Sequence, residues 1–346
     1  MTRSISASKI VLLIVLLSSI FCTNEPRPIA EIESNPEILK YKILVKFEES
    51  PSEGSLNKPF LVRKNEANDT YVICDEGDRC LYVYDKNGRF IRQIGQQGQG
   101  PGEFSRPNYF TIDESGNIFV LDTRNSRITV FKPDGTFDYS FNLGSRQGFN
   151  RYIISENNEM IVSKDSEYYF SIYDTDGELL REFGEMVRDN EDDNANRAYT
   201  EGFPIVNKKG EYVIFLQHLP FVRIYDPDGN LIEQKNVQEQ MGIKEYKALK
   251  DIRSSPMGME MTDYYLNVVY RDNKYWCIRN SWENETVRID VRILNEDFRL
   301  IEMKSFDFSE YEGGLKSADL RIVPEVLDSG EILFPMRNSA EILIFK

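Results

Sequence analysis

The residues best suited to bind a ligand are a few arginine, histidine, tryptophan and asparagine side chains, which lie between short apolar runs. Arginine and tryptophan dominate many binding sites, and arginines are unexpected in so acidic a chain, whose formal net charge is −15. The other interpretation is scattered, solvated side chains. The candidate ligand-binding residues are Arg124, His218, Trp282, Arg337 and Asn338.

The same sequence offers little for catalysis. His218 is the only histidine, no G-x-S-x-G elbow occurs, and no C-x-x-C pair suggests a zinc site. The acidic run Asp189–Asp193 could offer carboxylates to a calcium ion, but it lacks regular ligand spacing and fits a solvated loop better. We therefore assign no catalytic residue and no metal ligand. No cofactor is identified, and calcium is the one that the sequence could accommodate.

A glycine-rich stretch, "GQQGQGPGEFSRP" (95–107), superficially resembles a phosphate-binding loop. It has no Gly-Lys-Ser/Thr ending, and an apolar strand-like run follows it instead of a helix. We therefore expect it to connect two strands, with Phe104 packed beneath it and Pro107 at the start of a strand.

Composition limits the fold and the partners. Of the 346 residues, 40% are hydrophobic and 12% aromatic, which favours a globular β protein. The negative charge excludes nucleic acid as a natural partner, because a phosphate backbone requires a basic surface.

The N-terminus predicts export. Arg3 and Lys9 flank an apolar run, Ile10–Leu17, that is too short to span a bilayer. Cys22 follows, as in a bacterial lipoprotein signal, although Phe21 precedes it where a small residue is usual. We expect residues 1–21 to be removed, Cys22 to be lipidated and residues 22–39 to form a tether. The protein would then be anchored at the bacterial cell envelope, touching the membrane only through its lipid. A plain secretory signal would instead make it secreted or periplasmic.

Two cysteines bracket a short polar segment. Cys74 and Cys80 could face each other across a hairpin and form a disulfide, or lie reduced on opposite faces of a strand pair.

A repeat runs through the chain. "GNIFVLDTRNSRITVFKPDGTFDYSF" (116–141) aligns without a gap on "DTYVICDEGDRCLYVYDKNGRFIRQI" (69–94), and similar units begin at residues 158, 210, 272 and 330. Each unit contains short apolar-alternating runs typical of strands, and in four of them an Asp-Gly or Asn-Gly pair marks a tight hairpin.

These units predict an all-β fold, a six-bladed β-propeller of four-stranded antiparallel blades. The last unit lacks a fourth strand, which residues 41–49 would supply to close the ring. Seven blades would require another in residues 239–264, whose composition is helix-like. We expect a single propeller domain over residues 40–346, monomeric, with blades at about 59–95, 106–143, 150–184, 203–237, 264–306 and 321–346 plus 41–49.

The stretch "GQGPGEFSRPNYFTIDESGNIFVLDTRNSRITVFKPDG" (98–135) resembles an NHL repeat, and the whole chain is similar to six-bladed propeller lipoproteins of bacteria. The repeat, the export signal and the lack of a recognisable catalytic constellation in the sequence predict a non-enzymatic scaffold at the envelope that recognises a protein or a glycan through its loop-rich face. The alternative is a calcium-dependent hydrolase or lactonase, because some six-bladed propellers hold calcium in the central channel.

Topology indicates where a ligand would bind. Loops between the second and third strands share one face with the connections between blades, and the longest segments lie there (95–106, 185–202, 237–261 and 307–319). Asp122 and Asn125 would stabilise their own turn, and Arg127 could pair with Asp122 across the hairpin.

Overall fold

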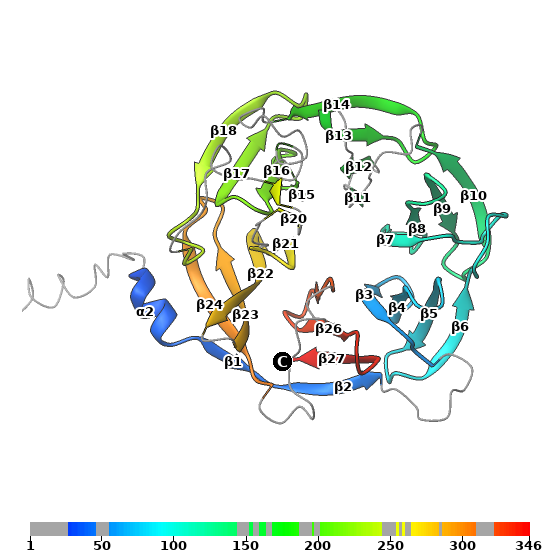
Figure 1. The fold of residues 1–346 in the computed structure, drawn as a ribbon, viewed down its shortest axis with the longest axis horizontal. Coiled ribbons are helices and arrows are strands. Elements are labelled where there is room, and N and C mark those ends of the chain that lie inside the picture. Colours follow the sequence, from blue (N-terminus) through cyan, green and yellow to red (C-terminus); the bar gives the residue numbers. More distant parts are fainter. Residues whose placement is uncertain are drawn as a thin grey trace, which may run out of the picture.

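Six β-sheets surround a central axis and form a closed ring (Figure 1). The computed structural model describes residues 27–45, 55–143, 152–154, 159–163, 168–186, 196, 201–243, 254–255, 258–259, 264–283, 286–308 and 322–346. The predicted six-bladed β-propeller with four-stranded antiparallel blades is confirmed.

The first three blades each contain four consecutive strands, numbered from the axis outward. Blade 1 contains β3 (Pro59–Asn65), β4 (Thr70–Asp75), β5 (Cys80–Asp85) and β6 (Phe90–Ile94). Blade 2 contains β7 (Pro107–Ile112), β8 (Ile118–Asp122), β9 (Arg127–Phe131) and β10 (Phe137–Asn142). Blade 3 contains β11 (Tyr152–Ile154), β12 (Met160–Ser163), β13 (Tyr168–Tyr173) and β14 (Leu179–Glu185).

The other three blades complete the ring. Blade 4 contains β15 (Gly202–Val206), β16 (Tyr212–Leu216), β17 (Phe221–Tyr225) and β18 (Leu231–Asn236). Blade 5 contains β21 (Asn267–Arg271), β22 (Lys274–Glu283), β23 (Thr286–Leu294) and β24 (Leu300–Phe306). Blade 6 contains β25 (Glu325–Val326), β26 (Ile332–Met336), β27 (Glu341–Phe345) and β2 (Tyr41–Val45).

The ring closes as predicted. Strand β2 pairs antiparallel with β27, with Tyr41 opposite Phe345, so the N-terminal strand becomes the outer strand of the last blade. This pairing covers the exposed edge that β27 would otherwise present.

The predicted tether is wrong over residues 29–39. A short helix, α2 (Ile29–Ser34), buries Ile32 against the outer part of blades 4 and 5. Strand β1 (Glu37–Leu39) then pairs in parallel with β24 as a fifth strand of blade 5. Strand β1 was not predicted because three residues are too few to show strand periodicity in the sequence.

Neighbouring blades pack through the Asp-Gly hairpins. Gly177 and Gly229 have φ angles of +90° and +88° in these turns. A Cβ atom on Gly177 would lie 2.5 Å from the Phe141 ring of blade 2, and one on Gly229 would lie 2.7 Å from Phe183 of blade 3. Glycine is therefore required both by the turn and by the contact with the preceding blade.

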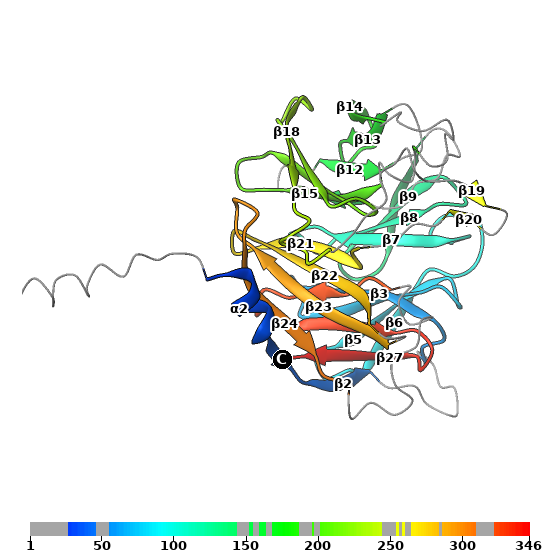
Figure 2. The ribbon, with the colours of Figure 1, turned by 60° about the vertical axis from the view of Figure 1, so that its left-hand side comes forward.

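The segment between blades 4 and 5 holds no seventh blade in its described part. It contains instead β19 (Ser254–Ser255) and β20 (Gly258–Met259), which form a short antiparallel pair. The helix-like composition of residues 239–264 had not indicated these strands. Figure 2 shows this pair toward one side of the ring, with α2 and the C-terminus toward the other. No helix among the described residues is long and apolar enough to cross a membrane.

Of the two arrangements left open for Cys74 and Cys80, the structure has the reduced pair on opposite faces and not the disulfide. Asp75 is the residue opposite Cys80, so Cys74 lies opposite Leu81 and the two cysteines point to opposite faces of the sheet. Both are free and buried in separate hydrophobic clusters. Burial raises the pKa of the Cys80 thiol to about 12, which keeps it protonated and unreactive near neutral pH.

Candidate functional site

The two faces of the ring are built from different connections. The connector face carries the loops between second and third strands, such as residues 76–79 and 123–126, and the connections between blades, such as 95–106. The turn face carries the turns between first and second strands and those between third and fourth strands. Cavities are found on both faces.

The glycine-rich connector, residues 95–106, lies on the connector face and is fixed by contacts with strand β9. The Arg127 guanidinium donates to the carbonyl oxygens of Gly100 (2.7 Å) and Glu103 (2.6 Å). Phe104 is fully buried and packs on Phe131, with ring centroids 5.7 Å apart. The prediction that this loop connects two blades is therefore confirmed.

The predicted pairing of Asp122 with Arg127 is wrong, although the two residues are opposite each other in the strand register. The buried Asp122 carboxylate accepts hydrogen bonds from the backbone N–H groups of Ser105 (2.8 Å) and Arg106 (2.9 Å). It therefore fixes the end of the connector, whereas Arg127 fixes its middle. Asp75 does the same in blade 1, where it accepts from Lys58 N at 3.0 Å.

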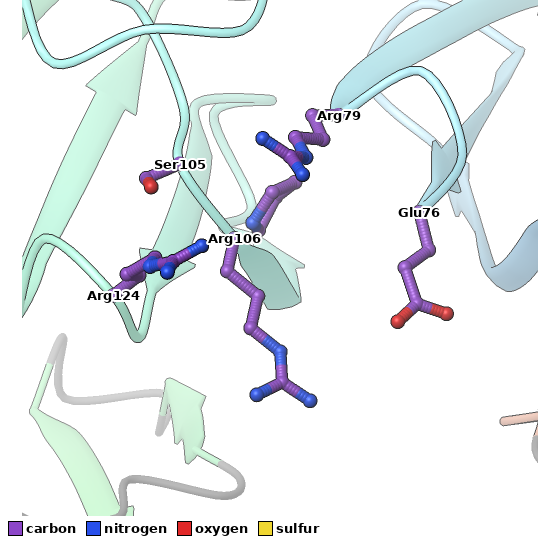
Figure 3. Close-up of a pocket in the computed structure, with 6 residues that line it drawn as sticks. Glu76, Arg79, Ser105, Arg106 and Arg124 are labelled. Atoms are coloured by element: carbon purple, nitrogen blue, oxygen red, sulfur yellow. The ribbon is translucent and has the colours of Figure 1, made fainter.

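A cavity of about 270 Å³ opens on the connector face between blades 1 and 2 (Figure 3). Arg79 comes from the loop after β4, Arg106 from the end of the glycine-rich connector and Arg124 from the loop after β8. Figure 3 shows Arg79 and Arg124 turned toward the segment that carries Arg106, with Glu76 across the opening. The rest of the lining is Ser105 and Pro107.

The three arginines of this cavity, which we call the arginine pocket, have no charge partner among the described residues. In the part of the chain that the structure describes, no ion pair or hydrogen bond involves the guanidinium group of Arg79, Arg106 or Arg124. Three adjacent positive charges without a carboxylate partner repel one another and attract an anion. The pocket is therefore an electropositive point on a protein of net charge −15.

Arg337 lies beside the arginine pocket. Its guanidinium forms an ion pair with Glu76, one of the pocket residues, and its side chain is 22% exposed. Arg124 and Arg337, both predicted as ligand-binding residues, are thus brought to the same region from blades 2 and 6, on either side of blade 1. Asn338 is the next residue in the exposed loop of blade 6.

The other two predicted ligand-binding residues lie elsewhere. His218 is in the loop between β16 and β17 of blade 4 and is buried, with Nε2 at 3.8 Å from Glu201 Oε2. Trp282 lies in strand β22 and not in a loop, because β22 and β23 continue as a long hairpin in which it pairs with Val287. His218 does not line the arginine pocket.

Cys22 and the acidic run Asp189–Asp193 lie outside the described residues, as does the predicted signal segment. Within the described ranges, no group of three or more His, Cys, Asp or Glu side chains is placed to hold a metal ion.

Sequence reasoning missed Arg79, Arg106 and Glu76. The signal was available, because residues 76–79 and 106 belong to the loop classes expected on the connector face. What the sequence did not show is that the connector, held by Asp122, brings Arg106 between the loops of two blades.

A second cavity, of about 880 Å³, lies at the turn-face end of the central channel. The inner strands β3, β7, β15, β21 and β25 and their first turns form its wall. Here the arginines are paired. Arg63 forms an ion pair with Glu325 and donates to the Tyr109 hydroxyl at 2.6 Å, which links blades 6, 1 and 2.

Comparisons with known proteins agree with this architecture. A family model, DUF5128, described as a 6-bladed beta-propeller, matches residues 61–312. Protein brain tumor of Drosophila melanogaster is 26% identical over 149 residues, 41% of this chain and 13% of that protein. NHL repeat-containing protein 3 of Homo sapiens is 30% identical over 71 residues, 20% of this chain and 20% of that protein. The chain thus spans only a small part of either relative, and the predicted resemblance to NHL repeats is confirmed at low identity.

A solved structure, of a presumed exported protein from Bacteroides fragilis, superposes with a TM-score of 0.54. It is 13% identical, and the superposition covers 90% of this chain and 99% of that one. At this identity the likeness shows the fold alone.

Proposed function

Because this chain belongs to the DUF5128 family of six-bladed β-propellers, we propose that it is a non-enzymatic binding scaffold whose connector face recognises an acidic segment of a protein partner. The observation that carries the proposal is the arginine pocket, where Arg79, Arg106 and Arg124 line one cavity without a charge partner among the described residues. A rigid ring holds these loops in place, so little entropy is lost when a ligand binds.

Arginine suits this role better than lysine would. Its planar guanidinium can donate two parallel hydrogen bonds to one carboxylate, and it is the cationic residue most enriched at interface hot spots. Three such groups around about 270 Å³ can bind two or three carboxylates of a short acidic segment. An acidic protein segment and an acidic glycan are two sources of the same carboxylate chemistry.

The test uses defined probes. A fluorescein-labelled decaglutamate peptide and a labelled decagalacturonate chain are titrated by fluorescence anisotropy against wild type, Arg106→Glu and Arg89→Glu. Arg89 is exposed in the turn between β5 and β6, so both variants change the net charge equally. We expect Arg106→Glu to lose at least tenfold in affinity for the peptide, while Arg89→Glu stays within about threefold. Binding of the glycan alone would assign the site to a glycan, and equal losses in both variants would refute the pocket.

We also propose that the protein is exported and anchored at the cell envelope through a lipid on Cys22. The support is the short apolar run Ile10–Leu17 ahead of that cysteine. The full-length chain expressed with a radiolabelled fatty acid should carry label, and Cys22→Ala should not. Label that persists in Cys22→Ala would refute lipidation at this residue.

A further inference from the structure

The cavity at the turn-face end of the central channel, which we call the channel mouth, has the size of a small-molecule site. Its volume of about 880 Å³ lies in the range typical of pockets for small organic ligands. Its polar lining includes Arg63, Arg271 and Glu325, while Ile112 of β7 and Val269 of β21 contribute apolar surface. Such a pocket suits a ligand that has an apolar body and a charged group.

The polar lining has a buried part and an exposed part. The inner pair, Arg63 and Glu325, has side chains only 14% and 7% exposed. Arg63 donates to the buried Tyr109 and lies over its ring, 5.4 Å from the centroid. These groups hold each other rigidly and are not available to a ligand without a large loss of stability.

Arg271 belongs to the exposed part. Its Nε donates to the Val326 carbonyl at 2.7 Å, which fixes the plane of the guanidinium. Its Nη2 lies 3.4 Å from the inner Glu325. Its Nη1 bonds Asp328, whose side chain is 66% exposed on the turn between β25 and β26. Asp328 is therefore a weakly held partner, because an exposed ion pair contributes little net stability.

We propose that the channel mouth binds a small organic carboxylate, whose carboxylate displaces Asp328 from Arg271 while its apolar body packs on Ile112 and Val269. Asp328 occupies the position of the ligand's carboxylate and competes with it. Val326 and Glu325 keep the Arg271 guanidinium oriented whether it pairs with Asp328 or with the ligand. The Arg271 side chain therefore loses little conformational entropy when the ligand replaces Asp328. This site lies on the face opposite the arginine pocket and is independent of it.

The test is a titration of the full-length protein with phenylacetate, followed by calorimetry, with phenylacetamide as an uncharged control of the same shape. Phenylacetate should bind roughly tenfold or more tightly than the amide, since the amide cannot form the charged pair with Arg271. Asp328→Asn should increase phenylacetate affinity about three- to tenfold, because it removes the competitor. Arg271→Gln should lower it at least tenfold, and Arg106→Glu should leave it unchanged.

The matched control is Glu114→Gln. Glu114 is exposed and lines the same cavity, so its removal changes the local charge as Asp328→Asn does, without freeing Arg271. Equal gains in both variants, or equal affinity for acid and amide, would overturn the exchange at Arg271. Asp328→Asn removes only an exposed group, so the test stands even if Arg271→Gln fails to fold.

A second probe distinguishes the source of the carboxylate. The tripeptide Ala-Ala-Phe carries the same aromatic body next to a C-terminal carboxylate, and its C-terminal amide serves as control. Tighter binding of the tripeptide than of phenylacetate would assign the site to peptide C-termini, and the reverse to free small acids. If neither acid binds, the proposed site is refuted.

Discussion

The two faces of this ring use arginine in opposite ways. On the connector face, Arg79, Arg106 and Arg124 share a cavity and have no charge partner among the described residues. At the channel mouth, Arg63 and Arg271 flank Glu325 and take both of its carboxylate oxygens. The first group can attract an anion, whereas the buried Arg63–Glu325 pair joins the inner strands of blades 1 and 6.

The difference shows that burial and pairing, and not residue type, separate binding arginines from structural ones. Burial, with the nearby positive charge of Arg63, lowers the pKa of Arg271. Substitutions in the buried Arg63–Glu325 pair should therefore affect stability, and substitutions in the arginine pocket should affect affinity.

The largest expected effect is on stability at the channel mouth. Glu325→Ala leaves Arg63 and Arg271 without their common buried partner and should lower the free energy of unfolding by about 3–5 kcal/mol. Asp328→Asn removes an exposed partner of Arg271 and should cost no more than about 1 kcal/mol. Urea denaturation measures both, and similar losses in the two variants would contradict the division into a buried and an exposed part.

The next largest effect compares two arginines of the same connector. Arg127→Ala removes the hydrogen bonds to Gly100 and Glu103 and should cost about 2 kcal/mol of stability. Arg106→Ala should stay within about 0.5 kcal/mol of wild type, because its side chain is exposed and has no partner in the part of the chain that the structure describes. Thermal and urea unfolding measure the stability of both variants. A larger loss of stability for Arg106→Ala than for Arg127→Ala would contradict the assignment of Arg127 as the residue that holds the connector.

A smaller effect is expected at Glu76, the one carboxylate of the arginine pocket. Glu76→Gln removes a negative charge from the cavity and releases Arg337 from its ion pair. Decaglutamate affinity should rise about two- to fivefold, with stability within about 1 kcal/mol of wild type. An affinity that falls would mean that the Glu76 carboxylate accepts a hydrogen bond from an N–H group of the peptide.

Much of the fold could be predicted from the sequence because the repeat carries it. The Asp-Gly hairpins recur because each packs closely on the preceding blade. The incomplete last unit predicted ring closure by residues 41–49, of which Tyr41–Val45 form the closing strand β2. The sequence could not decide whether Cys74 and Cys80 face each other, because a difference of one residue in the strand register moves a side chain to the other face of the sheet. Strand β1 was missed because it is only three residues long.

The candidate site could be predicted only in part. Loop topology correctly indicated the connector face for Arg124 and Arg337. It could not show that Arg79 and Arg106 join Arg124, because that cluster depends on how Asp122 fixes the connector between two blades. Loop topology also gave no reason to remove His218 from the candidate ligand-binding residues, although the fold buries this side chain in blade 4.

The central claim is that the unpaired arginines of the connector face bind an acidic partner. The most direct measurement is calorimetric titration of decaglutamate against wild type, the double variant Arg106→Ala/Arg124→Ala and the double variant Arg89→Ala/Arg299→Ala. Arg89 and Arg299 are exposed in turns between third and fourth strands, so the net charge changes equally in both variants. We predict a loss of at least tenfold in affinity for the first variant and less than about threefold for the second. Equal losses in the two would mean that the peptide responds to net charge alone and would contradict the claim.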